Sequence, residues 1–209
     1  MKITLTNIGR RFNRDWIFRH IEYEFTSGNS YAILGANGSG KSTLISVLNG
    51  SLTPSEGQIT YSDKQSTIDV SDVYKEISLA APYLELVETF TLKELINFHF
   101  KFKEFSSGMN ASKLIRLLGL ESSAHKEIRY FSSGMKQRTK LALAFCAATS
   151  ILFLDEPTSN LDAQGLAWYN ELTENFSKDK IIIVGSNQEH EYNFCSKKIQ
   201  VSDYKLFEN

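Results

Sequence analysis

The fold is decided by the stretch Gly35-Ala36-Asn37-Gly38-Ser39-Gly40-Lys41-Ser42. It fits the pattern G-x-x-x-x-G-K-[ST] and lies between two segments of different periodicity. Before it, residues 31–34 form a short apolar run of the kind found in buried strands. After it, residues 42–49 carry apolar side chains at helical spacing. A strand, a glycine-rich turn and a helix in this order are typical of a loop that binds phosphate groups.

The chemistry of this loop follows from its backbone. Glycines at positions 35, 38 and 40 permit backbone angles and a close approach that residues with a Cβ resist. Successive N–H groups and the start of the helix then face the phosphates. Lys41 brings positive charge to the β- and γ-phosphates, and the Ser42 hydroxyl is placed to bind Mg²⁺. The predicted nucleotide-binding residues of the loop are Gly35, Asn37, Gly38, Ser39, Gly40, Lys41, Ser42 and Thr43.

Composition and charge narrow the class of protein. The 209-residue chain has 23 Lys and Arg against 24 Asp and Glu, so its formal net charge is −1. This balance argues against a nucleic-acid-binding protein that works by bulk electrostatics. The two cysteines form no CxxC motif, which excludes a disulfide scaffold and favours a reducing compartment. No uninterrupted apolar run approaches the ~20 residues that span a bilayer, so a membrane role would require a partner.

Strand and helix patterns alternate at both ends of the chain. Strands are predicted at residues 1–6, 21–25, 59–61, 151–154, 181–184 and 198–207. Helices are predicted at residues 91–102, 112–118, 134–149, 163–176 and 189–195. This alternation predicts an α/β fold with a mostly parallel sheet. We expect one domain over residues 1–209, in which 1–82 and 132–209 form a nucleotide-binding core and 83–131 a helical subdomain.

Acidic side chains follow the apolar strand at residues 151–154. In a parallel sheet the carboxyl ends of the strands face the ligand crevice. Asp155 is therefore predicted to hold Mg²⁺ together with Ser42, and Glu156 to polarise an attacking water. Without the phosphate loop, the same two carboxylates would be interpreted as solvated groups after a core strand.

The segment that separates the protein families is Phe131-Ser132-Ser133-Gly134-Met135-Lys136-Gln137-Arg138. It resembles the signature of ATP-binding cassette (ABC) proteins, usually written L-S-G-G-Q, and Ser132 and Gly134 match that signature. Residues 159–162, Ser-Asn-Leu-Asp, resemble the D-loop of the same family. The resemblance runs through nearly the whole chain. It implies a P-loop NTPase core with an antiparallel β subdomain in its N-terminal part and an inserted helical subdomain.

The resemblance also implies a paired site for ATP. Two such cassettes dimerise head to tail, and the phosphate loop of one and residues Ser132, Gly134 and Met135 of the other enclose the nucleotide. A helix that begins near Ser132 offers N–H groups and a positive dipole end to the γ-phosphate, and Ser132 can serve as the helix cap as well. Phe12 stands where the family places an aromatic ring that stacks on adenine; core packing of Phe12 and stacking by Trp16 are the alternatives.

The activity implied by the resemblance is that of an ABC transporter ATPase subunit. It would hydrolyse ATP and drive separate integral membrane subunits from the cytoplasmic face of the membrane. We expect the helical segment 83–131 to be the docking side, or its aromatic side chains to fill the subdomain core. These side chains are Phe90, Phe98, Phe100, Phe102 and Phe105. The transported substrate, the direction of transport and a homo- or heterodimeric pairing are left open.

Two residues that the family usually has, a glutamine and a histidine, are absent at their expected positions. A glutamine is expected near residues 80–82, where Pro82 instead restricts the loop and offers no donor. A histidine is expected after the strand at 181–184, where Asn187 stands. Asn187 can hydrogen-bond a phosphate but cannot carry a proton. His190, expected to face solvent on the next helix, is the alternative.

Catalysis is therefore predicted to rest on Glu156, Lys41 and Asn187, with slow ATP hydrolysis. The alternative is a nucleotide-binding switch module with little or no hydrolysis. An ABC ATPase of DNA repair or chromosome structure would carry a long coiled coil between the phosphate loop and the signature, and the absence of sustained heptads between Ser42 and Ser132 argues against it. A small-molecule P-loop kinase would lack both the signature-like and the D-loop-like segments.

Overall fold

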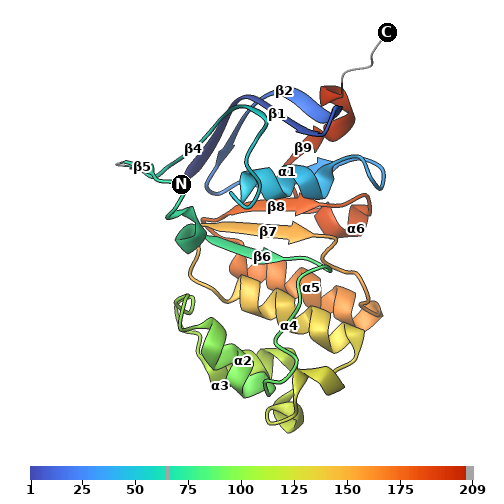
Figure 1. The fold of residues 1–209 in the computed structure, drawn as a ribbon. Coiled ribbons are helices and arrows are strands. Elements are labelled where there is room, and N and C mark those ends of the chain that lie inside the picture. Colours follow the sequence, from blue (N-terminus) through green and yellow to red (C-terminus); the bar gives the residue numbers. More distant parts are fainter. Residues whose placement is uncertain (65, 206–209) are drawn as a thin grey trace. The chain divides into compact units, whose positions relative to one another are not determined.

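The computed structural model describes residues 1–64 and 66–205. These residues form two compact units. Unit 1 contains the described residues of 1–77, 150–155 and 179–209, and unit 2 contains 78–149 and 156–178. The elements of each unit are labelled in Figure 1.

The N-terminal part of unit 1 is an antiparallel sheet with the strand order β2-β1-β4-β5. Its strands are β1 (Lys2–Phe12), β2 (Asp15–Thr26), β4 (Glu56–Ser62) and β5 (Thr67–Ile68). Alternation places Ile3 and Leu5 of β1 in the core, and a bulge beyond Leu5 restores Ile8 to the same side. The antiparallel β subdomain predicted for this part of the chain is confirmed.

A second sheet has the strand order β6-β7-β8-β3-β9. Its strands are β3 (Ser30–Leu34), β6 (Ile77–Ala80), β7 (Ile151–Asp155), β8 (Ile181–Gly185) and β9 (Lys197–Gln200). The pairs β7–β8, β8–β3 and β3–β9 are parallel, so these strands end at one edge (Figure 1). Every residue of β7 and β8 is buried, which explains their continuous apolar runs. The predicted parallel α/β sheet is confirmed.

Unit 1 also contains the short helices α1 (Lys41–Leu48) and α6 (Glu189–Tyr192), with 3₁₀ turns at Val73–Glu76 and Val201–Tyr204. The strand predicted over 198–207 is wrong for residues 201–204, and residues 206 and 207 lie outside the described residues. Ser and Asp favour turns, and here the Lys205 N–H donates to the Ser202 carbonyl. The helix predicted over 189–195 ends early, because the Cys195 N–H donates to the Tyr192 carbonyl in a turn.

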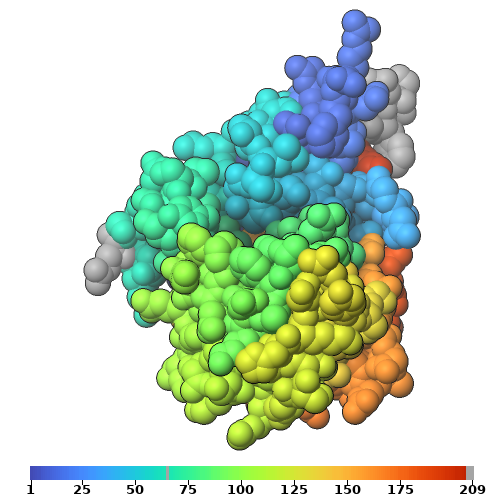
Figure 2. All heavy atoms as spheres, turned by 60° about the horizontal axis from the view of Figure 1, so that its bottom comes forward, coloured from blue at the N-terminus to red at the C-terminus, as the bar shows by residue number. Residues whose placement is uncertain are grey.

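Unit 2 is built on helices whose starts are capped by side chains. They are α2 (Leu92–His99), α3 (Ala111–Leu118), α4 (Ser133–Phe145) and α5 (Ala163–Phe176), with 3₁₀ turns at Glu121–Ser123 and Ile128–Tyr130. The caps are Thr91, Asn110, Ser132 and Asp162, and each accepts a hydrogen bond from a backbone N–H of the first turn. The segment 92–118 contributes exposed side chains to the surface of this unit, in green to yellow-green in Figure 2.

The division into units differs from the predicted subdomains. Helices α4 and α5 group with the segment 83–131, whereas the sequence analysis placed them in the nucleotide-binding core. The subdomain boundaries predicted from the sequence stay a prediction.

Candidate functional site

The phosphate-loop sequence forms the turn between β3 and α1. Its glycines have positive φ values, with 150° at Gly35 and 109° at Gly40. A Cβ at Gly40 would lie 2.3 Å from Ile17 Cγ2, and one at Gly35 would lie 2.4 Å from Ser39 Oγ. Both positions therefore require glycine for space as well as for backbone conformation.

Lys41 is the first residue of α1 and is only 5% exposed. Its Nζ donates hydrogen bonds to the carbonyl oxygens of Gly35, at 2.8 Å, and Ala36, at 3.2 Å. The ammonium group is thus folded back over the loop rather than extended into solvent. A positive charge and the N-terminus of α1 are held on the same turn.

The loop fits an anion in a further respect. Ser39 Oγ is buried and has no hydrogen-bond partner within the part of the chain that the structure describes. Asn37 and Gly38 beside it are exposed, and a Cβ at Gly38 would meet nothing within 4 Å. A hydroxyl without a partner on a turn with open space beside it matches the needs of a phosphate oxygen.

The carboxyl end of β7 places Asp155 beside the end of β8. Asp155 is 1% exposed and pairs in register with Gly185. A Cβ at Gly185 would lie 3.0 Å from Asp155 Oδ1 and 2.5 Å from Ile45 Cδ1, so Gly185 makes room for this carboxylate. The sequence analysis missed Gly185, although a glycine that closes an apolar strand was a usable signal.

Two predicted residues supply oxygen ligands suited to Mg²⁺. They are the buried carboxylate of Asp155 and the exposed hydroxyl of Ser42 in the first turn of α1. The described residues contain no group of three or more His, Cys, Asp or Glu that could hold a metal ion. Mg²⁺ suits such a sparse site, because it keeps several of its waters and needs only one or two protein ligands beside substrate phosphates.

The loop after β8 brings Asn187 to the phosphate loop. Asn187 Nδ2 donates to Asn37 Oδ1 at 3.1 Å, which joins two residues that the sequence analysis named separately. His190, the alternative to Asn187, is exposed on α6, as expected.

The aromatic residues of the β1–β2 hairpin differ in accessibility. Phe12 is 45% exposed, with the Arg10 guanidinium 4.6 Å from its ring centroid, so core packing does not account for it. Trp16 is less exposed and has two guanidinium groups near its ring, from Arg19 at 4.2 Å and Arg11 at 5.5 Å. Of the two rings, Phe12 offers the more open face to a base.

In unit 2, the signature-like segment forms the start of α4. Ser132 is exposed, and its Oγ accepts a hydrogen bond from the Met135 N–H at 3.2 Å, so its role as helix cap is confirmed. A Cβ at Gly134 would lie 3.0 Å from the carbonyl oxygen of Asn160, in the D-loop-like segment. Gln137, which is 2% exposed, donates to the Pro157 carbonyl at 2.8 Å. The two segments therefore pack closely against each other.

Glu156 has an unusual backbone. Its φ is 42°, in the left-handed region that non-glycine residues rarely adopt, and its carbonyl accepts a hydrogen bond from the Ser159 N–H at 3.1 Å. The side chain is half-buried. Residues in this backbone region cost of order 1–3 kcal/mol and cluster at active sites, which suits a carboxylate that must be aimed.

A lysine holds the loop where the family places its glutamine. Lys140 Nζ donates to the carbonyl oxygens of Pro82, at 2.8 Å, and Ala81, at 3.4 Å. Burial, and secondly the charge of Lys136, lower the pKa of Lys140. The sequence analysis missed Lys140, because nothing in its spacing indicated a contact with a loop so distant in the chain.

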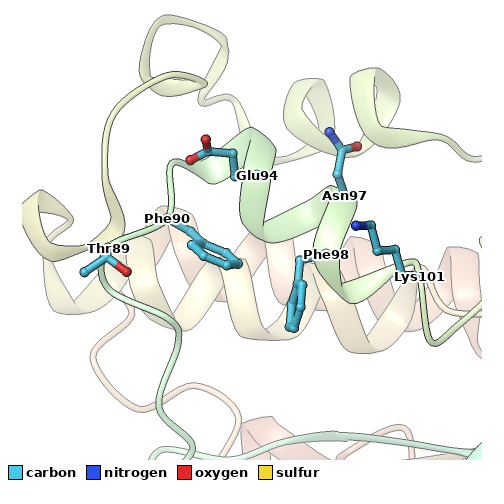
Figure 3. Close-up of a pocket in the computed structure, with 6 residues that line it drawn as sticks. All are labelled: Thr89, Phe90, Glu94, Asn97, Phe98 and Lys101. Atoms are coloured by element: carbon cyan, nitrogen blue, oxygen red, sulfur yellow. The ribbon is translucent and has the colours of Figure 1, made fainter.

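Two phenylalanines of the helical segment, Phe90 and Phe98, line a groove along α2. Phe90 and Phe98 point to the same side of α2 in Figure 3, and their ring centroids are 5.4 Å apart. Phe98 is 41% exposed and Phe102, whose ring lies 5.3 Å from that of Phe98, is 68% exposed. The groove has a volume of about 520 Å³ and is lined by Thr89, Phe90, Glu94, Asn97, Phe98 and Lys101. Phe98 and Phe102 are therefore only partly buried, so the hydrophobic core of the helical segment does not fully account for them.

Comparison with known proteins identifies the family. Residues 18–159 match the family described as ABC transporter. The chain is also 30% identical over 206 residues to the uncharacterized ABC transporter ATP-binding protein YybJ of Bacillus subtilis, covering 98% of this chain and 94% of that protein. This chain belongs to the ABC transporter family.

Other ABC proteins match over less of their own length. The sulfate/thiosulfate import ATP-binding protein CysA of Mesostigma viride is 33% identical over 90% of this chain, which spans 56% of that protein. The linearmycin resistance ATP-binding protein LnrL of Bacillus subtilis is 27% identical over 94% of this chain and 65% of its own length.

Solved ABC structures share the fold. An ABC ATP-binding protein of Pyrococcus furiosus superposes with a TM-score of 0.82 at 19% identity, over 99% of this chain and 100% of that one. A dimeric ATP-binding cassette in a post-hydrolysis state, bound to ADP and Pi, superposes with a TM-score of 0.79 at 18% identity, over 98% and 96%. Over residues 1–64 and 66–205, no helix has the length and apolar character needed to cross a membrane.

Proposed function

We propose that this ABC protein binds ATP in the turn between β3 and α1. One observation carries the proposal: Lys41 is buried on a glycine-built turn, with its ammonium group held over the loop by two carbonyl oxygens. The buried hydroxyl of Ser39 and the N-terminus of α1 add donors to the same turn. Phe12 would stack on adenine, which is worth ~1–3 kcal/mol.

Hydrolysis is the proposed reaction. Ser42 and Asp155 would hold Mg²⁺, which neutralises charge on the phosphate oxygens when it is bound. Glu156 accepts a proton from the attacking water, and its half-buried side chain follows directly on the Asp155 strand. Lys41 stabilises the negative charge that develops on the transferred phosphoryl group.

Pairing with a second cassette is part of the proposal. The start of α4, with Ser132 exposed and Gly134 and Met135 half-buried, presents its N–H groups for the γ-phosphate held by the partner subunit. The dimeric ATP-binding cassette with the same fold supports this pairing. The names of CysA and LnrL support a role in transport together with membrane subunits. The protein would then lie on the cytoplasmic face of the membrane, with the α2 groove toward those subunits.

A nucleotide-binding switch is the second candidate function. It is favoured by Pro82 and Asn187, which stand where a glutamine and a histidine are expected. Neither residue can carry a proton or a charge to the reacting phosphate. ATP would then join two cassettes without useful turnover.

Phosphate release from the purified protein with Mg²⁺ and ATP separates the two functions. For the enzyme, Glu156→Gln should lower release by about 10²–10⁴-fold while ATP still binds. Glu174→Gln, an exposed carboxylate on α5, is the matched control and should release phosphate like the wild type. If the wild type and Glu156→Gln both released phosphate only at the background rate, the enzyme hypothesis would be wrong and the nucleotide-binding switch would remain.

A further inference from the structure

The β1–β2 hairpin carries an arginine–aromatic contact on each of its two faces. Side chains two residues apart in a strand share a face, so Arg10 and Phe12 lie on one face of β1 and Arg11 on the other. Trp16 of β2 pairs in register with Arg11 and therefore shares its face. The Arg10 guanidinium lies 4.6 Å from the Phe12 ring centroid. The Arg11 guanidinium lies 5.5 Å from the Trp16 ring centroid.

The face that carries Phe12 is the one that packs on the phosphate loop. Phe18 of β2 is buried and pairs in register with Arg10, so it lies on the same face as Arg10 and Phe12. A Cβ at Gly40 of the phosphate loop would lie 3.6 Å from Phe18 Cδ1. Phe12 stands two residues beyond Arg10 toward the hairpin turn. It is therefore on the side of the phosphate loop, and Trp16 is on the opposite side.

The side chain of Arg10 is anchored in place. Its Nη1 donates to the Thr53 carbonyl at 3.0 Å, and its Nε is buried. The segment that follows Thr53 is tied to β1 on both sides of Arg10. The Ser55 N–H donates to the Gly9 carbonyl at 2.7 Å, and the Arg11 N–H donates to Ser55 Oγ at 3.1 Å. The guanidinium is thus held against the Phe12 ring from a second segment of the chain.

An anchored guanidinium changes what the ring can do. A cation is attracted to the face of an aromatic ring, so Arg10 holds the Phe12 ring in one orientation. Phe12 nevertheless stays 45% exposed, which leaves ring surface for a further stacking partner. A ring that is already fixed loses less conformational entropy when a base stacks on it.

We propose that Arg10 is a positioning residue that holds Phe12 as the platform for the purine base, in a stack of guanidinium, phenyl ring and base. The inference rests on the proposed function, because it takes base stacking on Phe12 as given. Arg10 acts on the base through Phe12, although it is positively charged. In this it differs from Lys41, whose charge acts on the phosphates.

The test compares the affinity of the full chain for ATP and for inorganic tripolyphosphate, which has the negative charges but no base. Arg10→Met keeps the length of the side chain and removes the guanidinium. It should lower ATP affinity by about 2- to 5-fold, the range of an exposed cation–π contact, and leave tripolyphosphate affinity unchanged. Arg14→Met is the matched control. It removes the same charge from an exposed position in the hairpin turn and should keep both wild-type affinities.

A double-mutant cycle tests positioning. In a Phe12→Ala background, Arg10→Met should leave ATP affinity unchanged, because no ring is left to position. Arg10→Lys keeps a cation but not the planar group, and its ATP affinity should lie between those of the wild type and Arg10→Met. Should Arg10→Met fail to fold, Arg10→Lys takes its place in both backgrounds. A lowered melting temperature with the same loss of ATP affinity in both backgrounds would assign Arg10 a purely structural role and overturn the proposal.

Two further results would overturn the role of Arg10. An equal loss of affinity for ATP and tripolyphosphate in Arg10→Met would show that its charge acts on the phosphates. A gain in ATP affinity would show that the guanidinium competes with the base for the ring.

Failure of this inference is distinguishable from failure of the proposed function. If the wild type bound neither ATP nor tripolyphosphate, nucleotide binding itself would be wrong. If Phe12→Ala lost ATP affinity and Arg10→Met kept it, only the role of Arg10 would be wrong.

Discussion

The two units of the molecule carry their candidate site residues in different ways. In unit 1, Lys41, Asp155 and Asn187 lie at or just beyond the carboxyl ends of elements built on one parallel sheet. In unit 2, Ser132 lies at a capped helix start and Glu156 in a turn with positive φ. The ends of buried strands such as β7 and β8 are positioned by many neighbours, whereas caps and turns depend on a few local hydrogen bonds.

This difference indicates that the two units have different functions. Residues of unit 1 should determine how tightly a nucleotide binds, and those of unit 2 should determine the rate of turnover, the pairing with a second cassette and the local stability. Substitutions in the two units therefore ought to change different measured quantities.

The largest effect is expected in unit 1, from Lys41→Ala. Removal of the buried ammonium should lower ATP affinity by at least about 100-fold, because hydrogen bonds and charge on the phosphates are lost together. Titration calorimetry measures this loss. Lys178→Ala, an exposed lysine that follows α5, is the control with the same change of charge and should bind like the wild type. Wild-type ATP affinity in Lys41→Ala would contradict the assignment of nucleotide binding to unit 1.

A smaller effect on affinity is expected from the β1–β2 hairpin. Phe12→Ala should lower ATP affinity by about 5- to 150-fold, the range that corresponds to loss of one base-stacking contact. Trp16→Ala is the matched aromatic variant and should change affinity little, because guanidinium groups already lie against that ring. The opposite order of effects, measured in the same binding assay, would transfer the stacking role to Trp16.

The smallest effect on nucleotide binding is expected in unit 2, from Thr91→Ala. Thr91 forms a capping box with Glu94 at the start of α2, in which each side chain bonds the backbone N–H of the other residue. Its loss should lower the free energy of unfolding by about 1 kcal/mol, with ATP affinity unchanged. Denaturant unfolding measures the first quantity. Thr91→Ser keeps the cap and should unfold like the wild type. A loss of ATP affinity in Thr91→Ala would contradict the assignment of nucleotide binding to unit 1 alone.

Much of the fold was predictable because its signals are local. The apolar run at 31–34, the glycine loop and the helical spacing after it specify strand, turn and helix in sequence order, and the structure has β3 and α1 there. The helix α5 was predicted with the bounds that the structure shows. Predictions failed where turns compete with strand or helix patterns, as at residues 201–204, since local hydrogen bonds decide such segments.

The candidate site was predictable only in part. The motifs named Lys41, Asp155 and Asn187, because each follows a recognisable pattern along the chain. Lys140 and Arg10 were not found, since a contact between residues from different elements leaves no periodic signal. The sequence analysis also could not show that Asn187 reaches Asn37, which is far away in the chain.

The sequence by itself determined the class of this protein: a strand–glycine loop–helix with Lys41, followed by a signature-like helix start, is a set of short-range patterns that the ABC family shares. Only the tertiary structure decided which residues of the chain meet. It set Gly185 against Asp155, Asn187 against Asn37 and Arg10 against Thr53. The physical reason is that backbone conformation depends on neighbours in the sequence, whereas burial and hydrogen bonding between distant residues arise only when the parallel sheet packs.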